Sequence, residues 1–296
     1  MARFPEWPPS NSMDVETLSL KKLVLLSVNI SEPALSALLK HSSSLEKLYI
    51  VGSGLLTAVN VGGFHINLKQ LILMACTGLR SITLHDFDLE KFQYIGRDID
   101  FHLANLSKVK ELDLGQVSVG LNNKVFSAIA CVASTLEVLS LDVSRQAEDI
   151  ERDAPGFPLL PNVKTLTLTL PTEVHDTITE FIEIGKKCPS LEIFKISLYW
   201  CASITKEKAW YTPFGFDFIR LKHVEISGYR GLMSDVQMAL YMLGNASKII
   251  IDPSCHPYDL CELTERQVMK IEEAGRSHAK SELSSCVFPQ VELVIL

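Results

Sequence analysis

The sequence predicts an α/β solenoid, a curved parallel sheet of stacked coils, because one short hydrophobic phrase recurs along nearly the whole chain. The phrase is L-x-x-L-x-L with conservative exchanges, and NLKQLILMACTGLRSITL, residues 67–84, contains it twice. One copy cannot bury its own leucines, so stacked copies must share one core. The twelve copies start at Leu20, Leu45, Leu56, Leu68, Leu79, Leu89, Val109, Leu136, Val163, Leu191, Leu221 and, weakly, Ala246.

Each phrase predicts one strand. Its x-L-x-L part alternates apolar with other residues, which is the pattern of a strand with one buried face. Cys76 lies three residues after Leu73, in the cysteine position of a leucine-rich repeat. Cys201 lies three residues after Leu198 in the same way, so the coil near residue 195 has two possible frames, starting at Leu191 or at residue 193.

The spacing of the phrases predicts two kinds of coil. Between Leu45 and Leu89 the steps are 11, 12, 11 and 10 residues, too short for a coil with a helix. We therefore expect two-strand coils here, with the phrases at Leu45, Leu68 and Leu89 in a main sheet and those at Leu56 and Leu79 on the opposite side. From Val109 onward the steps lengthen to 27, 27, 28, 30 and 25 residues, which leaves room for helices.

Capping residues and apolar stripes predict where these helices lie. Ser31-Glu32-Pro33 opens a helix over 31–39, and apolar stripes predict helices over 125–132 and 174–182. Ser234 with Gln237 predicts a capping box for a helix over 236–243. Thr264 with Gln267 predicts another, for a helix whose stripe includes the small residues Gly275 and Ala279 and continues until Ser284-Ser285. A strand over 291–295 then completes a β-α-β unit that closes the C-terminal end of the solenoid.

Composition excludes several classes of protein. The chain has 296 residues, 47% of them hydrophobic, and carries 28 basic against 35 acidic residues, so it lacks the positive charge typical of nucleic-acid binding. No stretch approaches the roughly 20 apolar residues of a membrane span. Seven cysteines without a C-x-x-C pair favour a reducing compartment. We expect a protein of the cytoplasm, the nucleus or both, with neither nucleic acid nor membrane as its partner.

The candidate partner-binding site is the concave face of the first main strands. Side chains beside the phrase leucines point to this face, where solenoids usually bind their partners. The residues form an apolar and aromatic centre with a basic rim, as interfaces tend to do. The alternatives are an ordinary solvated strand face, or apolar members covered by the chain's own N-terminal segment. The candidate residues are Lys22, Lys47, Tyr49, Gln70, Ile72, Met74, Lys91 and Gln93. Val24, Leu26, Val51 and Ile95 are expected in the same four rows.

No combination of residues predicts catalysis, a cofactor or a metal. Nucleophile, base and orienting group recur at no plausible spacing, so we expect no enzyme. Cys255, His256 and Cys261, with His278 further on, lack the closely paired ligands of a zinc site. The aromatic insertion KEKAWYTPFGFDF, residues 206–218, is open to two interpretations: a binding loop, or a plug over the edge of the solenoid.

The C-terminal segments carry a resemblance to a known family. LKHVEISGYRGLMSDVQMALYMLGNASKIIIDP, residues 221–253, resembles the FBD module of plant F-box/FBD/leucine-rich-repeat proteins. ELTERQVMKIEEAGRSHAKSELSSCVFPQVELVIL, residues 262–296, is similar to the tail that follows this module. The order of short and long repeats also resembles that family. The resemblance divides the chain into a polar remnant without an F-box (1–17), the solenoid (18–220) and an FBD-like repeat and cap (221–296).

The resemblance implies the substrate-recognition part of an SCF-type E3 ubiquitin ligase, a protein-protein interaction module without chemistry of its own. The partner would be a protein substrate. A Skp1-type adaptor would bind only through an F-box upstream of residue 1, because 1–17 are too few for the roughly 40-residue F-box of the family. Two alternatives stay open: a small-molecule, hormone-type receptor, and a regulatory or decoy protein that works without an F-box.

Overall fold

The computed structural model describes residues 6–7, 20–116, 123–143, 156–171, 184–199, 218–255 and 264–296. The chain forms two compact units. Unit 1 comprises Met1–Val138 with Glu148–Leu159, and unit 2 comprises Leu139–Ala147 with Leu160–Leu296. No helix in the described ranges is both long and apolar enough to cross a bilayer.

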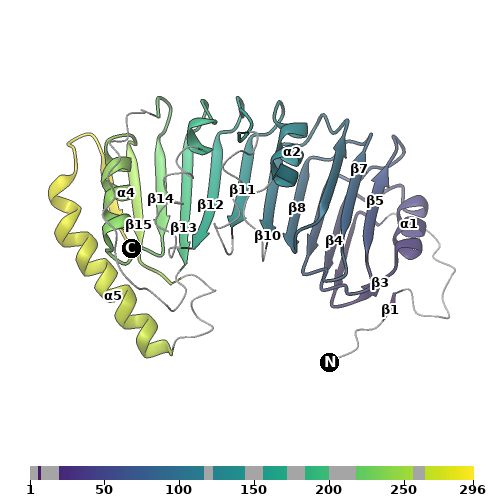
Figure 1. Cartoon of the computed structure of the whole chain (residues 1–296), viewed down its shortest axis with the longest axis horizontal. Helices are drawn as coiled ribbons and strands as arrows, with labels where there is room; N and C mark the ends of the chain where they lie inside the picture. The colour runs from purple at the N-terminus through teal and green to yellow at the C-terminus, as the bar shows by residue number, and fades with distance from the viewer. Residues whose placement is uncertain are drawn as a thin grey trace. The chain divides into compact units, whose positions relative to one another are not determined.

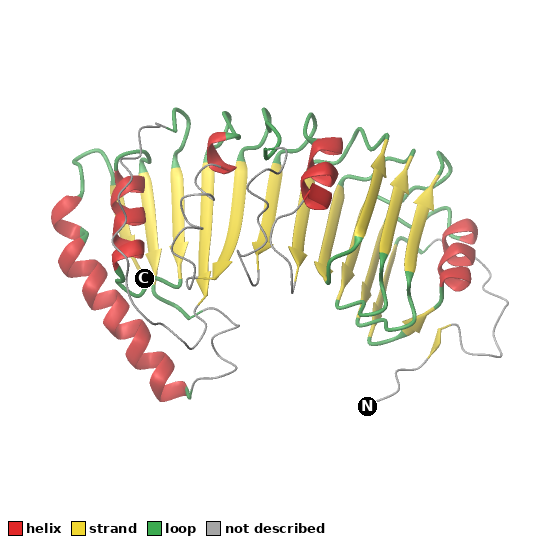
Figure 2. Ribbon diagram, viewed as in Figure 1, coloured by secondary structure: helices red, strands yellow, loops and turns green. Residues whose placement is uncertain are grey.

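Unit 1 alternates the strands of two parallel sheets, one behind the other (Figures 1 and 2). Its main-sheet strands are β2 (Lys22–Leu26), β4 (Lys47–Val51), β6 (Gln70–Met74), β8 (Lys91–Gly96) and β10 (Glu111–Gln116). The second sheet contains β5 (Ala58–Gly62), β7 (Ser81–His85) and β9 (Asp100–Ala104). The other elements are β1 (Glu6–Trp7), which pairs with β3 (Asn29–Ile30), and the helices α1 (Glu32–His41) and α2 (Asn123–Val132). The predicted two-strand coils are therefore confirmed.

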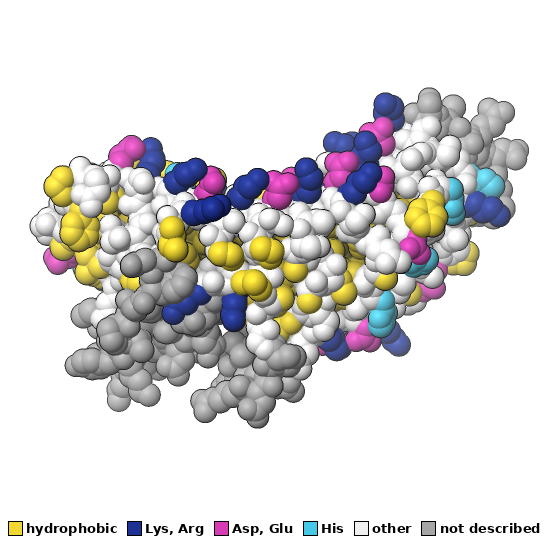
Figure 3. Space-filling model, turned by 90° about the horizontal axis from the view of Figure 1, so that it is seen from above, with side chains coloured by type: hydrophobic (Ala, Val, Ile, Leu, Met, Phe, Trp, Pro, Cys, Tyr) yellow, Lys and Arg dark blue, Asp and Glu magenta, His cyan; other side chains and the backbone are white. Residues whose placement is uncertain are grey.

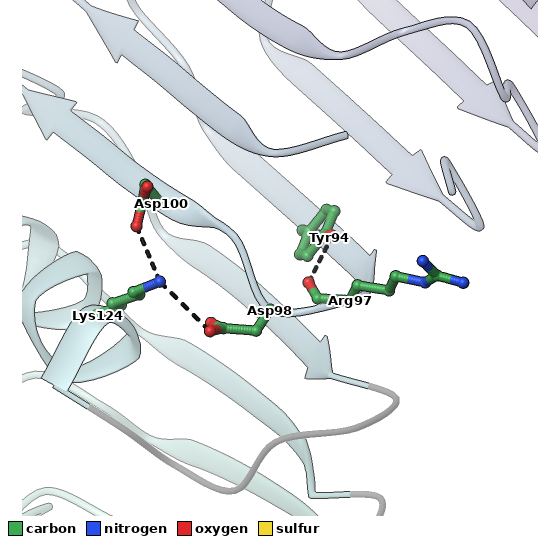
Figure 4. Close-up of polar contacts among 5 residues, drawn as sticks. All are labelled: Tyr94, Arg97, Asp98, Asp100 and Lys124. Atoms are coloured by element: carbon green, nitrogen blue, oxygen red, sulfur yellow. Dashed lines mark hydrogen bonds and ion pairs between the residues drawn. The ribbon is translucent and has the colours of Figure 1, made fainter. Parts of the chain in front are cut away.

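Strand β9 was not predicted, because its phrase lacks the leading leucine. Phe101 pairs in register with Ile82, and Leu103 pairs with Leu84, so β9 repeats the strand part of the phrase. The position that corresponds to Leu79 is Asp98. Lys124 of α2 bonds this aspartate at 3.3 Å and Asp100 at 2.9 Å (Figure 4). An ion-paired carboxylate thus stands where the other second-sheet coils bury a leucine.

Unit 2 contains the longer coils. Its strands are β11 (Val138–Val143, whose first residue belongs to unit 1), β12 (Thr165–Pro171), β13 (Ile193–Tyr199), β14 (His223–Ser227), β15 (Lys248–Asp252) and β16 (Glu292–Ile295). Its helices are α4 (Met233–Leu243), α5 (Glu265–Glu282) and the short 3-10 turn η3 (Ser284–Cys286).

The strand order confirms the predicted solenoid. Hydrogen-bonded neighbours follow the order β16-β15-β14-β13-β12-β11-β10-β8-β6-β4-β2 in an eleven-stranded sheet and β5-β7-β9 in a three-stranded one. Phe194 pairs with Leu166, and Ile196 pairs with Leu168, which decides in favour of the frame that starts at Leu191. The phrase leucines form the core; Leu45, Leu48 and Ile50, for example, are at most 1% exposed.

Most of the predicted helices are confirmed where the structure describes them. Ser31 caps α1 by accepting a hydrogen bond from the backbone N–H of Ala34, and α2 buries the predicted stripe. The capping box of Ser234 with Gln237 is wrong. Helix α4 begins at Met233, and the buried carboxylate of Asp235 accepts a hydrogen bond from the backbone N–H of Leu232 instead. The helix predicted over 174–182 lies outside the described residues.

The predicted β-α-β unit at the C-terminus is confirmed. Strand β16 pairs parallel with β15, and α5 connects them. The predicted capping box opens α5, since the amide side chain of Gln267 accepts a hydrogen bond from the backbone N–H of Thr264. Helix α5 ends at Glu282, just before the predicted end at Ser284-Ser285, and its Arg276 side chain donates to the backbone oxygen of Leu296. These contacts fix the start of α5 and join α5 to the residue that follows β16.

Candidate functional site

The eight predicted partner-binding residues lie on four neighbouring strands, β2, β4, β6 and β8, within unit 1. They alternate with buried phrase residues such as Leu48 and Leu71, so their side chains share the face of the sheet away from the core. We call this surface, with the other outward residues of the same strands, the outer face. The helices α1 and α2 contact β5 and β9, on the second-sheet side.

Strand register arranges the outer face in three columns that run across the strands. The first column is Lys22, Lys47, Gln70 and Lys91; the second is Val24, Tyr49, Ile72 and Gln93; the third is Leu26, Val51, Met74 and Ile95. The predicted residues therefore fall in adjacent columns, with Met74 in the third. Neighbouring members of a column are separated by one strand spacing, about 4.8 Å.

The turns that follow these strands help to fix the register. Ser27, Gly52 and Ala75 each have positive φ, at 53°, 76° and 51°. Their backbone N–H groups donate to the last carbonyls of the next strand, for example from Gly52 to Met74 at 2.9 Å. The third column therefore lies at the last residue of β2, β4 and β6 and at the residue before the last in β8.

The four apolar residues predicted in the same rows as the candidate site also lie on the outer face. Leu26 is 62% exposed and Val24 is 39% exposed, while Val51 and Ile95 are half-buried. Their signal in the sequence is their constant offset from the phrase: Leu26, Val51 and Ile95 stand six residues after Leu20, Leu45 and Leu89. The structure thus places all four on the predicted face, and they extend the apolar part of the candidate site to the third column.

The lysines of the outer face differ in whether they contact an acidic side chain. The Lys22 ammonium lies 4.9 Å from the ring centroid of Tyr49, whose hydroxyl donates to the Gln70 side chain at 3.1 Å. Lys91, in contrast, forms an ion pair of 2.7 Å with Glu111 of β10. Gln93 donates to Asp113 of the same strand at 2.7 Å. The acidic residues of β10 thus end the basic part of the surface.

Comparison with known proteins gives the family. Residues 9–283 match the model of the At1g61320/AtMIF1 LRR domain, which covers most of the chain. The chain belongs to this leucine-rich-repeat family. No curated protein shows significant similarity to the chain. As a member of the At1g61320/AtMIF1 LRR family, the chain has a domain that generally serves protein interaction.

This LRR domain also carries a charge pattern that the sequence analysis missed. In the main-sheet phrases from Leu20 to Leu221, the residue directly after the phrase start alternates in sign from coil to coil. Three pairs contact each other: Lys21 with Glu46 at 3.7 Å, Lys110 with Glu137 at 3.5 Å, and Lys222 with Glu192 at 2.8 Å. The series is Lys21, Glu46, Lys69, Glu90, Lys110 and Glu137 in unit 1 and Lys164, Glu192 and Lys222 in unit 2.

The alternation neutralises the edge at which the main strands begin. Figure 3 shows basic and acidic side chains interspersed along it. Exposed ion pairs of this kind each contribute only about 0–1 kcal/mol, but a slip by one coil would oppose like charges. The edge therefore favours the observed stacking, and it offers no continuous positive surface for a polyanion.

In unit 2 most outward side chains of the described main strands are polar, although Ile193, Ile250 and Val294 are apolar and half-buried. Lys195 forms an ion pair of 2.8 Å with Glu225, and the hydroxyls of Ser197 and Ser227 lie 2.7 Å apart. These groups already have partners within the unit. Ile250 and Val294 are neighbours in one column, but neither they nor Ile193 form an apolar column of four strands like the third column of unit 1. The outer face therefore remains the candidate site of the At1g61320/AtMIF1 LRR family member.

Two of the described cysteines, Cys76 and Cys188, are buried. Burial raises the pKa of the Cys188 thiol to about 12 and also raises that of Cys76, so both thiols stay protonated at neutral pH. Among the described residues no group of three or more potential ligands is placed to hold a metal. His256, Cys261 and residues 206–217 of the aromatic insertion lie outside the described ranges; Phe218 is buried and packs on Phe194.

Proposed function

We propose that the chain binds a protein target through the outer face of unit 1 and serves as the target-recognition part of an SCF-type E3 ubiquitin ligase. The accessible apolar columns on β2, β4, β6 and β8 carry this proposal, because the fold leaves them partly exposed beside basic side chains. Met and Tyr, present here as Met74 and Tyr49, are enriched in protein interfaces. The binding role requires no catalysis, cofactor or metal.

The ligase role rests on the resemblance of residues 221–296 to the FBD module and its tail. In this role the chain acts in the cytoplasm or the nucleus. A Skp1-type adaptor joins the assembly only through an F-box that precedes residue 1. The family match supports the leucine-rich-repeat domain and general protein interaction.

The test compares what the wild-type chain and two variants bind in cells of the source species. Met74→Glu places a charge in the third column, whereas Thr83→Glu makes the same change on β7 of the second sheet. The proteins that co-precipitate with each tagged chain are quantified. We expect Met74→Glu to lose specific proteins that the wild-type chain binds, and Thr83→Glu to retain them. If the ligase role is correct, we also expect these proteins to accumulate when the proteasome is inhibited, and a cullin to co-purify with the full-length gene product.

The two halves of the proposal fail separately. If both variants retain every protein that the wild-type chain binds, the outer face is not the binding surface. If Met74→Glu loses a partner whose level is unaffected by proteasome inhibition, and no cullin co-purifies, the binding role stands and the ligase role is wrong.

A further inference from the structure

The outer face has two unlike sides, and this asymmetry indicates the kind of partner segment that it accepts. The inference rests on the proposed binding role of the outer face. Its first column, at the start of the strands, contains lysines, whereas its third column, at their ends, contains only Leu26, Val51, Met74 and Ile95. A complementary segment therefore needs an apolar stripe beside a polar stripe, both running across the strands.

The charges of the outer face indicate which charge the polar stripe of the partner segment carries. Lys22 and Lys47 have no carboxylate partner in the part of the chain that the structure describes. Lys91 is neutralised by Glu111 of β10, and Asp113 lies on the same strand as Glu111. An acidic stripe is consequently attracted to the β2–β4 side of the face and repelled at β10.

The spacing between neighbouring strands, which separates the members of a column, favours one conformation of the partner segment. Four strands about 4.8 Å apart place four apolar side chains over about 14 Å. An α-helix rises about 5.4 Å per turn, so side chains one turn apart nearly match successive strands. In an extended segment, side chains on one face repeat every 6.6–6.8 Å or so and fall out of step with the column. A helix of about three turns fits better.

We propose that the outer face binds an acidic amphipathic helix of the partner protein, laid across β2, β4, β6 and β8. Its apolar stripe packs on the third column and on Val24, Tyr49 and Ile72 of the second. Its acidic stripe faces Lys22 and Lys47, and the acidic β10 fixes which end of the face receives the greater negative charge. This mode places an amphipathic helix on a pre-formed apolar surface, with charges setting its orientation.

The test uses synthetic peptides and the whole chain. The probe is a labelled peptide of about 15 residues with leucines at i, i+4, i+7 and i+11 and glutamates along one flank. The comparison peptides are a scrambled sequence of the same composition, and the same helix with lysines in place of the glutamates. Fluorescence anisotropy gives each Kd. We expect the acidic helix to bind about tenfold or more tightly than either comparison peptide.

Variants of the chain make the test specific. Met74→Glu should weaken binding of the acidic helix about tenfold, and Thr83→Glu, on the other sheet, should leave it unchanged. Lys47→Glu should weaken the acidic helix and strengthen the lysine helix, an exchange of preference that loss of folding cannot produce. Circular dichroism of each variant verifies folding.

Equal binding of the acidic and scrambled peptides, or an unchanged preference in Lys47→Glu, would overturn the proposal. The proposed function is judged by a separate result. If Met74→Glu loses a cellular partner that the acidic helix fails to displace from the wild-type chain, the outer face binds proteins but not in this manner. If no variant loses a partner, both proposals are wrong.

Discussion

Individual buried residues show how closely the coils fit one another. Tyr94 of β8 is fully buried within unit 1, and its hydroxyl donates to the backbone oxygen of Arg97 at 2.7 Å (Figure 4). Burial raises the pKa of this phenol above its ordinary value, so the hydroxyl remains a donor throughout the physiological range. Tyr49, on the outer face, donates to the side chain of Gln70 at 3.1 Å, where solvent competes.

Replacing each tyrosine by phenylalanine separates the two environments. Tyr94→Phe should lower the free energy of unfolding by about 1 kcal/mol, because the Arg97 carbonyl loses its buried donor. Tyr49→Phe, the matched control, should change it by less than about 0.5 kcal/mol. Urea denaturation of both variants measures the difference. Equal effects would contradict the burial assigned to Tyr94.

Single-residue prediction from the sequence succeeded where local alternation decides the direction of a side chain. Lys22, Tyr49 and Ile72 all lie on the expected face for this reason. It did not identify the ion pair of Lys91 with Glu111, because that contact depends on the register between the neighbouring strands β8 and β10. The alternation of charge after each phrase start was visible in the sequence, but only aligned coils reveal it.

At the scale of elements, prediction succeeded where several signals agreed and failed where one residue departed from the pattern. Strand β9 was missed because Asp98 replaces the leading leucine. The cap of α4 was misplaced because Asp235, rather than Gln237, bonds the preceding backbone. In α5, by contrast, the capping box and the small residues of the stripe were predicted, and Gly275 and Ala279 are the buried ones.

Helix α5 depends on the absence of a side chain at Gly275. A Cβ atom there would lie 2.4 Å from the backbone oxygen of Tyr229 and 3.3 Å from the Pro253 side chain. Gly275→Val should therefore displace α5 and destabilise unit 2 by about 1–3 kcal/mol. Hydrogen exchange should accelerate over α5 and β16, while β4 to β8 of unit 1 should exchange as in the wild type.

Ala274→Val provides the matched control, because Ala274 is exposed on the same helix. Its expected cost is limited to helix propensity, about 0.5 kcal/mol. Identical exchange patterns in the two variants would show that α5 does not pack on the loop after β14 as the structure has it.

At the scale of the whole molecule, the repeated phrase gives each main strand alternating buried and outward-facing side chains. The phrase leucines face the shared core, so they stabilise each coil only through its neighbours. The residues between them are free to vary, and in unit 1 they form the three columns of the outer face. The family match supports protein interaction in general, and our proposal assigns it to the columns of unit 1.

Photo-crosslinking in living cells tests this central claim most directly, since it captures a partner whose identity is unknown. A benzophenone amino acid is placed at Ile72 on the outer face or at Thr83 on the second sheet of the same unit. The account predicts a discrete crosslinked protein from position 72 and none from position 83. Crosslinks from position 83 alone, or the same adducts from both positions, would contradict it.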